Sequence, residues 1–284
     1  MRECQSDPLG DFGTGRASPT PNVLGIIPAR MGSSRFPGKP LALIGDFPMI
    51  WHVYQRGREA GCLNELLVAT PDDRIGDVCQ SLEIPFVLTQ ESATGDCIDC
   101  IAEVSSRMAA SLYVCIQGDE PCMPPEAIRR VTAIGQNHSL PVCGCAVITD
   151  PADVVDVTVP KVVLGSGDLA IYLSRSPVPY PKSRGVSYYA QVCVYAFQPT
   201  DLAWFAKTPV GPLEKAEGIG VLRFLEHHVP VQFVRVPASE VMVDTPEDLE
   251  RARKILFDLA ENRKLARELL GIPNEFPRIV PSGG

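Results

Sequence analysis

Residues 23–41, VLGIIPARMGSSRFPGKPL, decide the fold. The stretch from Val23 to Ile27 is a short apolar run of the kind that forms a buried strand. It passes directly into a loop shaped by glycine and proline, which carries serines and three cations, Arg30, Arg35 and Lys39. Backbone N–H groups and cations in such a loop can wrap a triphosphate, although a solvated basic turn is the alternative.

Strands and helices alternate after this loop. The apolar patterns predict helices at Pro48 to Ala60, Arg74 to Leu82 and Ile98 to Met108, and strands at Leu66 to Ala69, Phe86 to Leu88 and Leu112 to Ile116. This alternation predicts an α/β fold with a mostly parallel, Rossmann-like sheet covered by helices on both faces. Ligands of such sheets bind beyond the carboxyl ends of the strands, so residues 28–39 and 117–121 are the expected site.

The second half of the chain has a different pattern. Short strands joined by turns are predicted at Lys161 to Leu164, Ala170 to Leu173 and Tyr188 to Ala196, and they indicate an antiparallel extension. A helix from Leu213 to Glu226, a strand from Val231 to Val236 and a helix from Pro246 to about Leu270 complete the pattern. We expect residues 1–22 to form a flexible extension, 23–270 a single domain and 271–284 a tail.

The charge balance argues against some partners. The 284 residues include 34 acidic and 26 basic side chains, and the net charge of −8 disfavours non-specific binding to nucleic acid or to an anionic membrane. No apolar run is long enough to span a membrane, and residues 1–22 lack the apolar core of a secretory signal. A cytoplasmic location is therefore expected, with the ten cysteines as reduced thiols.

Two aspartates occupy positions suited to a metal ion. Asp119 follows, three residues on, the apolar run that ends at Ile116, and a carboxylate there is costly unless a cation or hydrogen bonds compensate it. Asp244 precedes a helix start at Pro246, and on its own it fits a helix N-cap as well. Together the two carboxylates can hold Mg²⁺, with nucleotide phosphates and water completing the octahedron.

Four ordered segments resemble one enzyme family, the cytidylyltransferases that activate 3-deoxy-manno-octulosonate (KDO), also called CMP-KDO synthetases, and their CMP-sialate relatives. The segments are residues 28–41, QGDEP at 117–121, LSRSPVPY at 173–180 and VDTPEDLE at 243–250. The resemblance implies a fold of the nucleotide-diphospho-sugar transferase type. It also implies a Mg²⁺-dependent transfer of CMP from CTP to a small anionic acceptor, with release of pyrophosphate, by a homodimer formed through residues 159–198.

The resemblance implies roles for individual residues. It assigns catalysis to Arg30, Lys39, Asp119 and Asp244, with the two aspartates as metal ligands. It assigns the nucleotide to Pro28, Ala29, Arg30, Ser34, Arg35, Lys39, Asp99 and Gln117. It assigns the acceptor to Arg175, Gln191, Glu214 and Glu217. Solvated acids remain the alternative for the two glutamates, and a first-turn helix acid is the alternative for Asp99.

The chain departs from the family in two regions that hold the acceptor or the nucleoside. KDO enzymes read Ser-Gly-Thr-Asp/Glu-Arg where this chain has Asp96-Cys97-Ile98-Asp99-Cys100, so a cysteine replaces the arginine. They usually carry a histidine and then a glycine before an Ile-Tyr pair, where this chain reads QVCVY at 191–195. We expect an acidic sugar as acceptor. A small phosphonate such as phosphonoformate, UTP in place of CTP, and a catalytically silent nucleotide-binding protein are the alternatives.

Overall fold

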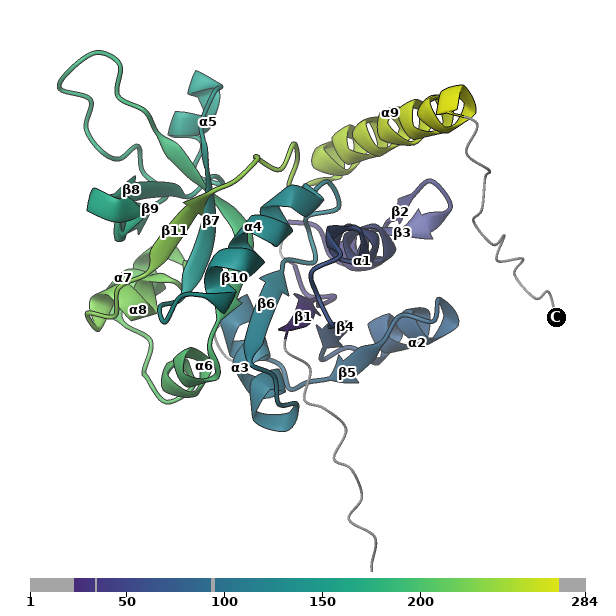
Figure 1. The fold of residues 1–284 in the computed structure, drawn as a ribbon, viewed down its shortest axis with the longest axis horizontal. Coiled ribbons are helices and arrows are strands. Elements are labelled where there is room, and N and C mark those ends of the chain that lie inside the picture. Colours follow the sequence, from purple (N-terminus) through teal and green to yellow (C-terminus); the bar gives the residue numbers. More distant parts are fainter. Residues whose placement is uncertain (1–22, 34, 93–94, 271–284) are drawn as a thin grey trace, which may run out of the picture.

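The computed structural model describes residues 23–33, 35–92 and 95–270, so the predicted extension 1–22 and tail 271–284 lie outside the described residues. Within the described part of the chain, the central sheet has nine strands (Figure 1). Its main path runs in the order β11-β7-β10-β6-β1-β4-β5. These strands are β1 Val23–Pro28, β4 Glu65–Thr70, β5 Phe86–Leu88, β6 Leu112–Ile116, β7 Val142–Val147, β10 Tyr189–Phe197 and β11 Gln232–Arg235.

The strand directions confirm the expected mostly parallel α/β sheet. Along the main path, neighbouring strands are parallel except where β10 pairs with β6 and with β7. β1 lies between β4 and β6, so the chain continues from β1 to one side and later returns on the other. Such a reversal of strand order opens a crevice at the carboxyl ends of the strands that flank it.

Helices cover both faces of the sheet. One face is packed by α1 Met49–Ala60, α2 Asp73–Ser81 and α4 Pro125–Gln136, and the other by α3 Cys97–Arg107, α6 Pro199–Phe205 and α8 Leu222–Glu226. Along β1, Val23 and Ile27 pack with the first group of helices, whereas Leu24 and Ile26 pack with the second. Successive residues of a strand point to opposite faces, so this strand is apolar throughout because both of its faces are buried.

The C-terminal helix anchors a segment beside the loop after β1. This loop leads through the 3-10 turn Lys39–Leu41 into a small hairpin, β2 Leu43–Ile44 and β3 Phe47–Pro48. Leu249 and Leu256 of α9 Pro246–Leu270 pack against Ile44 and Met49 in a separate apolar cluster. The residues that directly precede α9 therefore lie close to the loop after β1.

The predicted antiparallel extension is only partly separate from the main sheet. β8 Lys161–Leu164 and β9 Ala170–Ser174 form a ribbon that joins the sheet where β8 pairs with β10. β10 itself lies inside the main sheet, between β6 and β7. Figure 1 shows the ribbon and the short helix α5 Pro151–Val155 at the end of the molecule opposite α2 and β5.

One predicted element is wrong and several were missed. The single helix expected from Leu213 to Glu226 is two short helices, α7 Pro212–Glu217 and α8, because Gly218 ends α7 with a φ of 62°, a conformation that favours glycine. The sequence interpretation also passed over α4, α5, α6, β7 and the hairpin of β2 and β3. None of the described helices is long and apolar enough to cross a membrane. The cysteines in the described residues are free thiols, as expected.

Candidate active site

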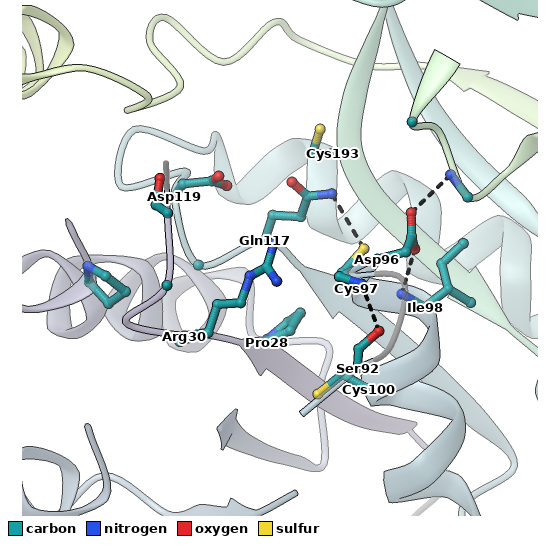
Figure 2. Close-up of a pocket in the computed structure, with 18 of the residues that line it drawn as sticks. Pro28, Arg30, Ser92, Asp96, Cys97, Ile98, Cys100, Gln117, Asp119 and Cys193 are labelled. Atoms are coloured by element: carbon teal, nitrogen blue, oxygen red, sulfur yellow. Dashed lines mark hydrogen bonds between the residues drawn. The ribbon is translucent and has the colours of Figure 1, made fainter. Parts of the chain in front are cut away.

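A cleft of about 390 Å³ opens at the carboxyl ends of β1 and β6, where the strand order predicts one. Its walls come from the loops after these two strands, the start of α3, the turn between α7 and α8, and the segment before α9. In Figure 2, Asp119 lies at one end and Cys97 and Cys100 at the other, with Gln117 between them. We call these the carboxylate end (Lys39, Asp119 and Asp244) and the thiol end (Cys97 and Cys100).

One cation joins two carboxylates at the carboxylate end. Lys39 Nζ donates to Asp119 Oδ2 at 2.8 Å and to Asp244 Oδ1 at 3.0 Å. Arg35 Nη2 donates to the other oxygen of Asp244 at 2.7 Å. Burial acts to lower the pKa of Lys39, but the two carboxylates outweigh it and the pKa lies above its usual value. Lys39 is therefore charged at neutral pH and balances the aspartates.

The two aspartates fit a divalent metal ion. Oδ1 of Asp119 is buried without a hydrogen-bond partner, which is costly for a carboxylate oxygen unless a cation compensates it. Carboxylate oxygens are the ligands that Mg²⁺ prefers. In the residues that the structure describes, no group of three or more His, Cys, Asp or Glu side chains forms a metal cluster. Phosphate oxygens and water would therefore have to complete the coordination of such an ion.

The loop after β1 forms the cationic wall of the cleft. The N–H of Met31 donates to Asp72 Oδ2 at 2.7 Å, so the side chain of the residue at the N-cap position of α2 holds this loop. The guanidinium of Arg30 packs against Gly95, where an added Cβ would lie 2.8 Å from Nη1. The predicted residues that line the cleft here are Pro28, Ala29, Arg30, Arg35 and Lys39, whereas Ser34 lies outside the described residues.

Two glutamines meet at a tyrosine in the middle of the cleft. Nε2 of Gln117 donates to the Tyr195 hydroxyl at 3.1 Å, and Nε2 of Gln191 donates to the same oxygen at 3.2 Å. Nε2 of Gln117 also donates to Cys97 Sγ at 3.4 Å, and Figure 2 shows its amide oxygen pointing away from Cys97. With these nitrogens engaged, the two amide oxygens are available to accept hydrogen bonds from a ligand.

Neutral groups line the thiol end. Burial raises the pKa of Cys100 to about 12. A hydrogen bond with Cys115 and burial together raise the pKa of Cys97 well above its usual value. Both thiols are therefore protonated at neutral pH. The predicted acceptor residue Arg175 also lines the cleft, so the cleft wall carries a further cation.

Three predicted site residues lie behind the cleft wall. Glu214 pairs with Arg223 at 2.6 Å between Oε1 and Nη2, and Nη1 of Arg223 lies 3.3 Å from Asp99 Oδ1. Glu217 accepts hydrogen bonds from the hydroxyl of Ser174 at 2.7 Å and from the backbone N–H of Arg175 at 2.8 Å. These contacts hold α3, α7, α8 and β9 together. The ligand-binding roles expected for Asp99, Glu214 and Glu217 remain predictions.

Sequence reasoning missed two groups that shape the cleft, Asp72 and Tyr195, and it assigned no site role to Asp96, which it noted together with Asp99 at a helix start. The two aspartates directly precede helices, which is the usual position of an N-cap, and this signal was available for both. Tyr195 lies in an apolar run and gives no such signal, because only the fold brings its hydroxyl to the two glutamines.

Comparisons with known proteins agree with this architecture. A family model described as cytidylyltransferase matches residues 24–270. A 3-deoxy-manno-octulosonate cytidylyltransferase of Solibacter usitatus is 37% identical over 237 residues, which cover 82% of this chain and 94% of that protein. The protein of the same name from Escherichia coli is 34% identical over 243 residues, covering 84% and 97%.

A solved structure extends the likeness to three dimensions. The structure of CMP:2-keto-3-deoxy-manno-octonic acid synthetase complexed with CTP matches with a TM-score of 0.79 and 32% sequence identity. The match covers 84% of this chain and 99% of that chain. The resemblance inferred from the four sequence segments is therefore confirmed.

The sheet order, the cationic loop after β1 and the aspartates at the reversal of strand order define a nucleotidyltransferase. Because the family model spans almost all of the described residues and the relatives exceed 30% identity, the chain belongs to the cytidylyltransferase family.

Proposed function

We propose that this chain transfers CMP from CTP to KDO, or to a closely similar keto-acid sugar, and releases pyrophosphate. The observation that carries the proposal is the meeting of Lys39, Asp119 and Asp244 in the cleft of a chain whose relatives are named KDO cytidylyltransferases. Both carboxylates and the cations Arg30, Arg35 and Lys39 are present in this cleft. A catalytically silent nucleotide-binding protein has no need of two metal carboxylates, so their retention disfavours that alternative.

The carboxylate end suits the triphosphate of CTP. Arg30, Arg35 and Lys39 offer positive charge along one wall, and charged donors of this kind form strong hydrogen bonds to phosphate oxygens. The Arg35 side chain is 49% exposed, so it is free to turn from Asp244 toward a phosphate. The reaction is in-line attack of an acceptor oxygen on the α-phosphorus with pyrophosphate leaving, and these cations stabilise the charge that develops.

Asp119 and Asp244 would hold Mg²⁺ in this reaction. The ion would supply charge neutralisation at the phosphates and fix the orientation of the leaving pyrophosphate. The buried, unpaired oxygen of Asp119 supports this assignment. Burial raises the pKa of the neighbouring Glu120 to about 8, so Glu120 is mostly neutral at pH 7 and competes little for the same ion.

The rest of the cleft suits a polyhydroxylated acid. The amide oxygens of Gln117 and Gln191 can accept hydrogen bonds from sugar hydroxyls, because their nitrogens are engaged by Tyr195. Arg175 can pair with a carboxylate, and a guanidinium binds carboxylates through two parallel hydrogen bonds. A keto-acid sugar offers both kinds of group.

A small phosphonate is the second candidate acceptor. The observation that favours it is the thiol end, where Cys100 stands in place of the arginine found in KDO enzymes and its thiol is neutral. A cleft wall with a neutral thiol in place of an arginine would suit an acceptor of different size or charge. The amide oxygens of the glutamines argue the other way, because a phosphonate presents acceptors where these oxygens need donors.

An acceptor panel decides between the two candidates. Purified protein would be incubated with CTP and Mg²⁺ and, in turn, KDO, its 8-amino analogue, sialate-type acids and phosphonoformate, with UTP replacing CTP as the nucleotide control. Mass spectrometry of the products would identify any CMP conjugate. We expect a CMP conjugate of a keto-acid sugar. Turnover with phosphonoformate alone would replace this proposal by the second candidate, and no conjugate with any acceptor would favour the silent protein.

We propose in addition that the chain forms a homodimer through the β8–β9 ribbon and its neighbourhood. Large apolar side chains are exposed there, with Ile171 63% and Tyr180 85% accessible, and such a patch is typical of an interaction surface. Sedimentation equilibrium tests the proposal. The wild-type chain should sediment as a dimer and the Ile171→Asp variant as a monomer, whereas a wild-type monomer would contradict it.

A further inference from the structure

We propose that Asp96 is a positioning residue that joins the start of α3 to the turn between α7 and α8, and thereby sets the acceptor side of the cleft. The proposal rests on the proposed function above. It concerns a residue that is not among the site residues expected from the sequence.

The carboxylate of Asp96 bonds two separate parts of the cleft wall. Its Oδ1 accepts from the backbone N–H of Ile98 at 2.8 Å and so caps α3. Its Oδ2 accepts from the backbone N–H of Gly220 at 2.9 Å. Both bonds are drawn in Figure 2. Asp96, Cys97 and Gly220 all line the cleft, so the joint is part of the wall that a ligand meets.

The approach of the two segments depends on a glycine. A methyl group added at Gly220 would overlap the carboxyl group of Asp96. The turn therefore reaches Asp96 only because residue 220 has no side chain. Asp96 and Gly220 form a matched pair in which the carboxylate fills the space that a larger residue would occupy.

The turn between α7 and α8 is also held by a second hydrogen bond, from Arg175, so two contacts define its position. Nε of Arg175 donates to the carbonyl oxygen of Glu217 at 2.7 Å, immediately before the turn. A second link between α3 and α8 runs behind the joint, through the ion pair of Asp99 with Arg223. Loss of the Asp96 bond would let the turn move away from α3 while Arg175, a predicted acceptor ligand, is still attached to it. Loss of this bond should therefore weaken binding of the acceptor more than binding of CTP.

The test is a double-mutant cycle on Asp96 and Gly220. Asp96→Ser keeps a hydroxyl that can cap α3 but cannot reach Gly220 as well, and Gly220→Ala pushes the turn away. Each single variant should raise the KM for the acceptor about tenfold and leave the KM for CTP within about twofold. The double variant should be no worse than the poorer single variant, because the carboxylate that the added methyl meets is gone.

A matched control separates the joint from simple helix capping. Asp150 caps α5 in the same way, with Oδ1 accepting from the N–H of Ala152 at 2.9 Å, but it lies away from the cleft. Asp150→Ser should leave both KM values unchanged. Equal rises in the KM for CTP and for the acceptor in the Asp96 variant, or fully multiplicative losses in the double variant, would overturn the proposal.

A second readout does not depend on turnover. The Gly220 amide should exchange its hydrogen slowly in the wild-type protein and at least about tenfold faster in the Asp96→Ser variant, because its acceptor is lost. Asp96→Asn, which keeps one oxygen for Ile98, provides a folded variant if the serine variant is unstable, and it should show the same acceleration. Unchanged exchange at Gly220 in a folded variant contradicts the joint, whereas failure of the wild-type protein to turn over any acceptor contradicts the proposed function instead.

Discussion

The ammonium group of Lys39 lies 2.8 Å from an oxygen of Asp119 and 3.0 Å from an oxygen of Asp244. Asp119 follows β6 and Asp244 precedes α9, so segments that are distant in the sequence meet at one cation. Two carboxylates this close repel each other unless positive charge stands between them. The same geometry that Lys39 stabilises in the free protein is suited to hold a metal ion beside a triphosphate.

Neutralising either aspartate should abolish turnover without unfolding the protein. Asp119→Asn and Asp244→Asn remove a charged oxygen ligand but little volume, so we expect a loss of about a thousandfold or more in kcat. Pyrophosphate release measures the loss, and circular dichroism measures the fold. Glu247→Gln is the matched control, because Glu247 is exposed in the first turn of α9 and should tolerate the same change. Full activity in either aspartate variant would refute the site assignment.

Removal of divalent metal should stop the reaction reversibly. Only two carboxylates of the described residues converge at the carboxylate end, so the ion is expected to bind weakly until phosphate oxygens complete its coordination. Dialysis against EDTA should therefore abolish pyrophosphate release, and Mg²⁺ should restore it with a half-maximal concentration that falls as CTP is raised. Unimpaired release after dialysis would show that Asp119 and Asp244 serve another purpose.

Breaking the ion pair between Glu214 and Arg223 should destabilise the fold. Both side chains are about 5% exposed or less, and removal of Glu214 leaves the buried Arg223 charge with only its longer ion pair to Asp99. Glu214→Gln should lower the free energy of unfolding by about 3–5 kcal/mol. The double variant Glu214→Leu/Arg223→Met, in which both charges are removed, should be more stable than Glu214→Gln. Urea unfolding provides the measurement.

The exposed pair of Glu126 with Arg130 gives the contrast for that experiment, because an exposed ion pair contributes little to stability. Glu126→Gln should change the unfolding free energy far less than Glu214→Gln. A Glu214→Gln protein of normal stability with a raised KM for the acceptor would instead assign Glu214 to acceptor binding.

Asp201 should make stability depend on pH. Burial raises its pKa to about 6, whereas the unfolded chain titrates near the ordinary value. Between these values the folded protein binds the proton that the unfolded chain has lost, so the stabilisation present below about pH 4 is lost as pH rises through 6. Relative to Asp201→Asn, the wild-type unfolding free energy should fall by up to about 3 kcal/mol between pH 4 and 7. A constant difference between the two proteins would contradict the shifted pKa.

Local sequence signals predicted the elements that place the loop after β1. The apolar run at Val23 and the alternation that follows it are set by short-range patterns, and the structure reproduces those strands and helices to within one or two residues. The place of a strand in the sheet was not predictable in the same way, because nothing in residues 188–196 indicates whether that strand lies in the main sheet or outside it. β10 was therefore expected in the extension, yet it pairs with β6 and β7.

Site residues were predictable where they lie in segments that resemble the family. They were less predictable where their role depends on contacts that only the fold creates. Lys39, Asp119 and Asp244 lie in ordered segments that resemble the family, and the fold brings them together. In the sequence Glu214 fits a solvated acid, and only the structure shows that it pairs with Arg223 on the next helix. The break between these helices was signalled by Gly218 and Gly220, but the surrounding charged residues fitted one longer helix equally well.

The most direct test of the central claim is pyrophosphate release by the purified protein with Mg²⁺, KDO and either CTP or UTP. We predict release with CTP that requires KDO, with little or none when UTP replaces CTP. Release that is independent of KDO, or a preference for UTP, would contradict the assignment of this chain as the enzyme that joins CMP to a keto-acid sugar.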